Sequence, residues 1–182
     1  MQFKVFNDFV LKEKVLKDVL DEYEGKLPEQ LITAWKDYGF GTILSGYIKI
    51  INPKMFEDIL KETYFRSIES IPIMVTGFGD IITWEKNKYV GVVKYRKGKA
   101  NIVSASFKYF FQNLLEECFL DEDLEWKPYL EAINDYGKLD YEECFGYVPL
   151  LGLGGSEKVE NLKKVKIREH IEIITQLVGK IE

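Results

Sequence analysis

The stretch IPIMVTGFGDIITWEKNKYVGVVKYRKGKANIV, residues 71–103, decides the fold. It holds short apolar runs at 71–76, 80–84, 89–95 and 100–103, rich in the β-branched and aromatic residues typical of strands. The runs are separated by Gly77-Phe78-Gly79, Lys86-Asn87-Lys88 and Lys97-Gly98-Lys99, which are turn-forming segments. The pattern therefore predicts an antiparallel meander of about four strands at the centre of the chain.

Helical patterns lie on the N-terminal side of this meander. Residues 5–20 repeat apolar side chains at helical spacing, which predicts an amphipathic helix. A second helix is expected from Pro28 through Trp35, ended by Gly39 and Gly41. Residues 42–51 favour a strand, and Asn52-Pro53 then starts a short helix over 55–64.

Helical patterns also follow the meander. Helices are expected over 107–119, over 122–133 and, as a closing helix, over 167–178. The glycine-rich stretch 135–155 predicts loops. We therefore expect an α+β fold in one compact unit over residues 1–182, with a central, mostly antiparallel sheet flanked by N- and C-terminal helices.

Length and composition set the broad class. A chain of 182 residues with 46% hydrophobic content can bury a full core without a metal or disulfide. Charges recur along the N-terminus, and no uncharged apolar window reaches about 18 residues, so neither a signal peptide nor a membrane helix is predicted. Cys118 and Cys144 have no CxxC spacing and are expected to be buried free thiols. We therefore expect a cytoplasmic protein that does not bind membranes.

Charge is distributed unevenly along the chain. The net charge is −5, which disfavours direct nucleic-acid binding. Residues 116–143, the acidic segment, carry eleven acids against two lysines, so the remainder is net basic. Such a segment can be a partner surface for a basic protein or merely a solvated helix face. The residues expected to bind a partner are Glu116, Glu117, Asp121, Glu122, Asp123, Glu125 and Trp126.

Catalytic and metal sites find little support in the sequence. The acids 121–125 lack the spacing of a calcium-binding loop, and a single histidine excludes most imidazole-rich metal sites. The chain has no GxSxG motif whose serine His170 could activate. The acids and aromatics around Cys144 should raise the pKa of its thiol. No catalytic residue, metal or cofactor is therefore predicted.

Two glycine clusters and one basic run leave alternatives open. The loop Gly152-Leu153-Gly154-Gly155-Ser156 could cradle a phosphate but lacks the ending of a P-loop. Residues 76–80 favour a structural turn. The basic run Lys94, Arg96, Lys97 and Lys99 brackets a hairpin tip and is interpreted as an exposed strand end protected against edge pairing.

Several motifs together resemble a known family. Residues Trp35, Gly39, Gly41 and Pro53, followed by Gly77, Gly79, Asp80 and Trp84, are similar to the GAD-like domain, expected over 1–105. Residues Gly146, Pro149, Gly154 and Gly155 resemble the C-terminal region of the Tdi-type immunity proteins, expected over 106–182. Some of these features are also similar to the SMI1/KNR4 superfamily of immunity proteins.

The resemblance implies a function. Members of the Tdi-type family are cytoplasmic immunity proteins that bind a DNase toxin delivered by the type VI secretion system. For this chain, the resemblance implies a non-enzymatic antitoxin whose partner is a cognate toxin that is basic and nuclease-like. The alternatives are a small-molecule or nucleotide-binding regulatory domain that uses the glycine-rich loop, and an enzyme of unknown chemistry. The oligomeric state is unknown at this stage.

Overall fold

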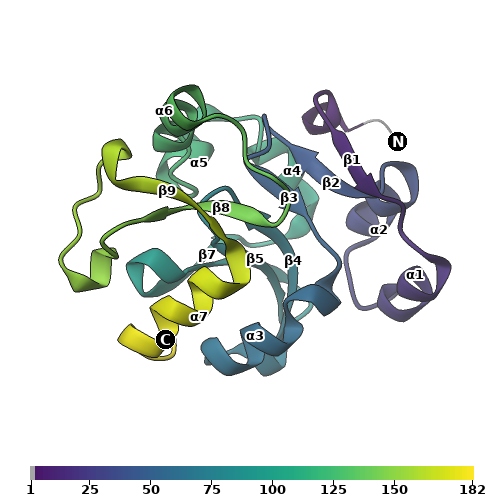
Figure 1. The fold of residues 1–182 in the computed structure, drawn as a ribbon. Helices are drawn as coiled ribbons and strands as arrows, with labels where there is room; N and C mark the ends of the chain where they lie inside the picture. The colour runs from purple at the N-terminus through teal and green to yellow at the C-terminus, as the bar shows by residue number, and fades with distance from the viewer. Residues whose placement is uncertain (1–2) are drawn as a thin grey trace.

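The computed structural model describes residues 3–182 and is built on one seven-stranded antiparallel sheet (Figure 1). Its strands lie side by side in chain order, β1 to β7, so each pairs with its neighbours in sequence. Their bounds are β1 Val10–Glu13, β2 Phe40–Ile43, β3 Ile48–Ile50, β4 Ser70–Thr76, β5 Ile81–Glu85, β6 Tyr89–Lys94 and β7 Lys99–Ser104. The four strands expected over 71–103 are confirmed as β4 to β7, and the α+β class is confirmed.

The N-terminal region differs from its predicted helix over 5–20. It forms a short 3-10 turn at Lys4–Phe6, then β1, and only then α1, Lys17–Tyr23. Val10 of β1 pairs with Thr42 of β2, and all residues of β1 are exposed. Backbone pairing at the edge of the sheet thus outweighs the helical spacing of the apolar side chains.

The strand expected over 42–51 is interrupted by a tight turn between β2 and β3. Leu44 and Ser45 both have φ +55, and Gly46 has φ +87. The Asp8 carboxylate accepts hydrogen bonds from the backbone N–H groups of Leu44 at 3.0 Å and Ser45 at 2.6 Å. This cap offsets the strain of two left-handed residues, a conformation that apolar patterning does not reveal.

The flanking helices agree in part with the sequence patterns. The predicted second helix is α2, Glu29–Asp37, and the closing helix is α7, Ile167–Val178. A 3-10 turn at Pro53–Met55, capped by the Asn52 side chain, leads into α3, Glu57–Thr63. The helix expected over 107–119 is instead broken into α4, Phe110–Asn113, and α5, Glu117–Glu122. The next helix, α6, spans Lys127–Tyr136, so it begins at Lys127 rather than at Glu122, and Pro128 lies in its first turn.

A second, two-stranded sheet has its first strand in the region 135–155 that was expected to form loops. β8, Glu143–Tyr147, pairs antiparallel with β9, Leu162–Lys166, and residues 148–161 connect them. The Phe145 N–H donates to the Gly77 carbonyl at 2.7 Å, which attaches this hairpin to the turn between β4 and β5. The glycines of this region therefore serve an ordered hairpin.

The large sheet is covered on both faces. Alternate residues of the central strands enter two separate apolar clusters: Met74, Ile82 and Val92 enter one, while neighbours such as Val75 and Ile81 enter the other. The first cluster lies against α2, α4, α5 and α6, and the second against α3 and α7. Burial of both faces explains why β4 to β6 read as nearly continuous apolar runs.

The two cysteines have different environments. Both are free thiols, but only Cys144 is buried, whereas Cys118 on α5 is exposed, so the expectation of two buried thiols is wrong for Cys118. Within residues 3–182, no helix is long and apolar enough to cross a membrane.

Candidate functional site: a buried charge network beneath the acidic segment

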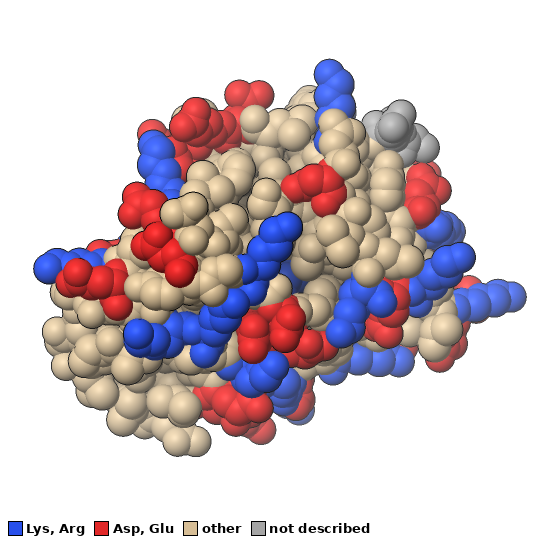
Figure 2. Space-filling view, turned by 45° about the horizontal axis from the view of Figure 1, so that its top comes forward, with Lys and Arg blue, Asp and Glu red and all other residues tan. Residues whose placement is uncertain are grey.

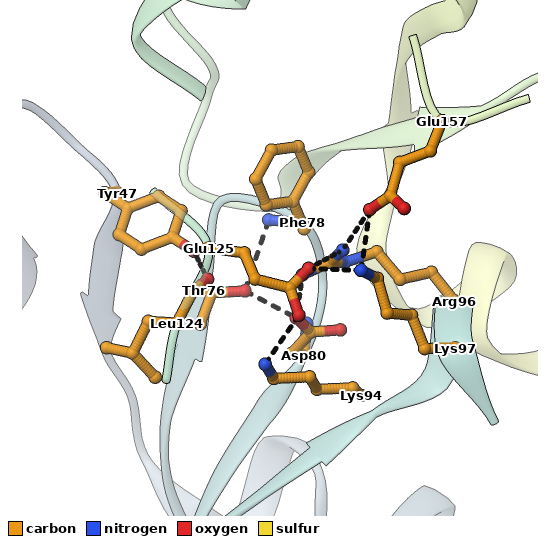
Figure 3. A network of polar contacts seen from close by, with 10 residues as sticks. All are labelled: Tyr47, Thr76, Phe78, Asp80, Lys94, Arg96, Lys97, Leu124, Glu125 and Glu157. Carbon is orange, nitrogen blue, oxygen red and sulfur yellow. Dashed lines mark hydrogen bonds and ion pairs between the residues drawn. The ribbon is translucent and has the colours of Figure 1, made fainter. Parts of the chain in front are cut away.

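Glu125 lies at the centre of a network of buried charges (Figure 3). It occupies the turn between α5 and α6, while its partners come from the sheet. Its carboxylate accepts from Lys94 Nζ at 2.8 Å and Arg96 Nη1 at 2.7 Å, and it pairs with Lys97 Nζ at 2.8 Å. The acidic segment is therefore attached to the end of β6 by ion pairs.

Two more carboxylates complete this set, which we call the charge network: Asp80, Lys94, Arg96, Lys97, Glu125 and Glu157. Asp80 Oδ2 accepts from Arg96 Nη2 at 3.0 Å. Glu157, from the β8–β9 connection, lies 2.7 Å from Lys97 Nζ and 3.6 Å from Arg96 Nη1. Three cations thus face three carboxylates, so the network is neutral as a whole.

The burial of Lys94 and Arg96 contradicts the interpretation of the basic run as an exposed strand end for these two residues, whereas Lys97 is half-buried and Lys99 is exposed. Lys94 is 2% and Arg96 7% exposed, and the Arg96 guanidinium lies 4.6 Å from the centre of the Phe78 ring. A buried cation is tolerated only when it is paired, because desolvation costs several kcal/mol for each unpaired ion. The carboxylates therefore make it possible for these side chains to lie inside the fold.

The electrostatics of Glu125 follow from this arrangement. Burial alone would raise the pKa of its carboxyl, but the Arg96 charge and the hydrogen bonds from Lys94 and Lys97 hold that pKa well below the usual range. Glu125 also has φ +61, a left-handed conformation that costs a non-glycine residue about 1 kcal/mol. The ion pairs of Glu125 must offset that strain. A glutamate is therefore needed at this position for its charge, and not for the conformation of the turn.

The turn that carries Asp80 is fixed by local hydrogen bonds. Thr76 Oγ1 accepts from the backbone N–H groups of Phe78 and Asp80, each at 3.2 Å. Gly77 allows the close approach of α6, since a Cβ there would lie 2.5 Å from the Tyr129 ring. Gly79 has φ +78, which favours glycine. The segment interpreted as a structural turn thus positions one carboxylate of the charge network.

The residues expected to bind a partner do not share one environment. Glu116, Glu117 and Glu122 are exposed, and Asp121 and Asp123 are half-buried. Asp121 pairs with Lys127 at 2.5 Å. These five carboxylates lie on or beside α5 and remain candidates for a partner surface.

Glu125 and Trp126 turn inward instead. The Glu125 carboxylate is used by the charge network, and the Trp126 ring stacks on Tyr47 with 6.2 Å between ring centres. The inward position of Glu125 could have been suspected from Lys94 and Arg96, because cations at the end of an apolar strand need carboxylate partners. The identity of those partners depends on the tertiary fold.

Acidic side chains are not the only charges on this side of the molecule. Figure 2 shows acidic side chains along its upper left rim and a band of basic side chains across its middle. Lys163, Lys164 and Lys166 on β9 are exposed. A partner would therefore meet both signs of charge, with the acidic part contributed by α5 and its surroundings.

The residues that carry the family resemblance have structural roles. Trp35 and Trp84 are buried in the core, and Pro53 opens the turn before α3. Gly39 has φ +93, and a Cβ on Gly41 would lie 2.2 Å from the Val10 carbonyl oxygen. These positions are defined by close packing around the N-terminal part of the sheet.

The motif residues of the C-terminal region also lie where other parts of the chain pass close to their backbone. A Cβ on Gly146 would lie 2.5 Å from the His170 ring, and one on Gly155 would lie 2.0 Å from the Pro149 carbonyl oxygen. The Val148–Pro149 peptide is cis, and Gly154 has φ +85. These residues shape the β8–β9 hairpin and its connection.

Cys144 and His170, the residues considered for nucleophilic catalysis, are both buried. Burial raises the pKa of the Cys144 thiol well above its usual range, which makes it a poor nucleophile. His170 is buried, and its Nε2 has no hydrogen-bond partner. No cluster of three or more His, Cys, Asp or Glu that could hold a metal ion occurs within residues 3–182.

Comparisons with known proteins agree with the motifs. Residues 104–178 match the family model of the T6SS immunity protein Tdi1, C-terminal, and residues 2–95 match that of the GAD-like domain. The fold is similar to the crystal structure of Atu4351 from Agrobacterium tumefaciens, with a TM-score of 0.72 at 17% identity over 96% of this chain and 89% of that one. No curated protein matches this sequence.

The two family matches assign different parts of the structure. The GAD-like match spans β1 to β6 and helices α1 to α3, and the Tdi1 match spans α4 to α7 with the β8–β9 hairpin. The charge network joins the two, because Asp80 and Lys94 lie in the first and Glu125 and Glu157 in the second. The resemblance inferred from the motifs is confirmed: the chain belongs to the GAD-like domain family, and its residues 104–178 match the model of the C-terminal domain of the T6SS immunity protein Tdi1.

Proposed function

We propose that this protein is a cytoplasmic immunity protein that neutralises a cognate DNase toxin by binding it, without catalysis. The observation that carries the proposal is the Tdi1-type domain over residues 104–178, which contains the whole acidic segment. A toxin that cleaves DNA needs a basic face to hold phosphates. A carboxylate-rich surface can compete for that face.

The proposed contact surface is the exposed side of α5. Among residues 3–182, Glu116, Glu117 and Glu122 have exposed side chains that form no ion pair, unlike Glu125. The charge network fixes the turn after α5 to the sheet, so the carboxylates of α5 are held in place before a partner arrives. Preorganisation of this kind lowers the entropy cost of association.

Co-expression tests the proposal directly. The gene would be expressed with a neighbouring nuclease-like toxin gene, and survival and pulldown would be measured. The variant Glu116→Lys/Glu117→Lys/Glu122→Lys should lose protection and weaken toxin binding at least ten-fold, more strongly at low salt.

A matched control makes the same change of charge elsewhere. Glu62, Glu169 and Glu172 are exposed on α3 and α7, and their triple lysine variant should protect like the wild type. Equal protection by both triple variants would exclude α5 as the contact surface. Killing that is unaffected by the wild-type protein would exclude the immunity function for that toxin.

A further inference from the structure

A pocket of about 510 Å³ lies between α7 and the connection from β8 to β9, beside the charge network. Its walls include the apolar residues Leu150, Leu151, Leu153, Ile174 and Val178, and its polar and charged groups include Arg96, Lys97, Glu157, His170 and Lys180. A pocket of this size with apolar walls and a few convergent polar groups is typical of a small-molecule site. We refer to it as the α7 pocket.

Two polar groups at the α7 pocket lack partners. His170 Nε2 and Arg96 Nε are buried nitrogens without hydrogen bonds, on side chains that are more than nine-tenths buried. Buried polar atoms are nearly always satisfied in a folded protein. Both nitrogens have almost no solvent-accessible surface, so they lie behind the wall of the pocket and are not offered to a ligand inside it.

The charges around the pocket depend on one surface residue. The inner carboxylates Asp80 and Glu125 are deeply placed, but they face three cations, Lys94, Arg96 and Lys97. The third carboxylate, Glu157, is 44% exposed and comes from the connection between β8 and β9 (Figure 3). If Glu157 moves away, three cations face two carboxylates, so the charge network gains a net positive charge although Lys97 keeps its ion pair with Glu125.

The glycine-rich loop does not provide a phosphate cradle. The N–H groups of Leu153 and Gly155 donate to the Leu150 carbonyl, and that of Gly154 donates to the Leu151 carbonyl, each at 3.0 Å. Backbone N–H groups that are already used cannot bind phosphate oxygens. An anion here would be held by side chains, which favours a single carboxylate over a nucleotide.

Apolar side chains mark the other end of the pocket. Leu153 is 61% and Val178 45% exposed, both line the pocket, and a Cβ on Gly152 would lie 2.7 Å from Val178 Cγ1. Removing such surface from water stabilises a complex by about 25 cal/mol per Å². The opening thus matches the aliphatic part of a ligand.

We propose that the α7 pocket binds a small amphiphilic carboxylate, whose anionic group replaces Glu157 on Lys97 and whose apolar chain lies between Leu153 and Val178. This site is independent of the toxin-binding surface on α5. Glu157 then acts as an internal competitor, which occupies the cationic end of the pocket when the ligand is absent.

Octanoate is a suitable probe, with acetate and 1-octanol as probes for the anionic group and the apolar chain alone. Binding would be measured by thermal shift and by calorimetry on the full chain. Octanoate should raise the Tm by a few degrees at saturation, because a ligand that binds only the native state stabilises it. Acetate and 1-octanol should give smaller shifts.

Two pairs of variants locate the site. Glu157→Gln removes the competitor and should tighten octanoate binding about five-fold, the effect of about 1 kcal/mol from one ion pair. Glu160→Gln, on the same connection but paired only with Lys158 at 3.6 Å, should leave it unchanged. Val178→Trp should block the opening and weaken binding at least ten-fold. Leu177→Trp, also exposed on α7 but outside the pocket lining, should bind like the wild type.

The outcomes decide the proposal. Tighter binding by Glu157→Gln together with loss in Val178→Trp supports it. It is overturned if octanoate gives no larger shift than acetate in both the wild type and Glu157→Gln. It is equally overturned if the two tryptophan variants bind alike. Loss of toxin protection is not an expected result of any of these variants, so the two proposals fail separately.

Discussion

Glu125 and Arg96 form a 2.7 Å ion pair between the region that matches the Tdi1 family model and the residue that directly follows the GAD-like match. The pair fixes the turn after α5 onto the end of β6, and Lys94 and Lys97 share the same carboxylate. A contact of this kind couples the stability of the sheet to the position of the acidic segment. It also gives a direct test of the network.

Glu125→Gln should destabilise the protein by about 2–4 kcal/mol, because it leaves buried cations without a counter-charge. Urea unfolding at pH 7 measures this loss. The neighbouring Glu122→Gln is the control, since Glu122 is exposed, and its effect should stay within about 0.5 kcal/mol. Equal stability of both variants would show that Glu125 does not hold the segment.

Lys49 predicts a specific pH dependence. It is 1% exposed, and burial lowers its pKa to about 8 from an unfolded value near 10.5. Between these values the folded chain loses the proton while the unfolded chain keeps it, so stability contributed at this site rises with pH. The limit is about 3 kcal/mol, from 1.36 kcal/mol per unit of pKa.

The variant Lys49→Met removes that titration. It should be more stable than the wild type at pH 7, and the difference should shrink as pH approaches 10. Comparing the two proteins at each pH cancels the titration of all other groups. A difference that is constant from pH 7 to 10 would contradict a buried charged lysine.

Gly146 and His170 should behave as a coupled pair. A Cβ on Gly146 would lie 2.5 Å from the His170 ring, so Gly146→Ala should cost about 1–3 kcal/mol by overpacking. Trimming the ring with His170→Ala should make the same glycine substitution nearly neutral. A double-mutant cycle by urea unfolding measures the coupling, and additive effects would refute the contact.

The two thiols should differ in reactivity. Cys118 is exposed, whereas Cys144 is buried. A chromogenic disulfide reagent should therefore titrate one thiol in the native protein and both in denaturant. Cys118→Ser should remove the native reaction, and its persistence would contradict this assignment.

The sequence was most informative where neighbouring residues determine structure. The turns at 77–79, 86–88 and 97–99 correctly predicted β4 to β7, and Asn52-Pro53 predicted the start of the segment leading to α3. Local turn chemistry and strand patterning are enough for such elements. The closing helix α7 was equally clear because its apolar residues recur at helical spacing.

The sequence failed where distant partners decide. The spacing of apolar residues over Val10–Glu13 indicates a helix, but this segment pairs with β2. β8 forms because it pairs with β9, a strand that follows only after the connection 148–161. Likewise, Lys94 and Arg96 were interpreted as exposed because their carboxylate partners come from α5–α6 and from the β8–β9 connection. Neither spacing nor composition shows which side chains will meet.

The strand order also bears on how the chain assembles during translation. Because each strand of the large sheet pairs with its sequence neighbours, the sheet can add one strand after another as the ribosome releases the chain. Lys94 and Arg96 would then form their ion pairs with Glu125 only later, because Glu125 lies 29 residues beyond Arg96. An unfinished chain would hold unmatched charges at the end of β6, so the final closure of the fold depends on the arrival of its second half.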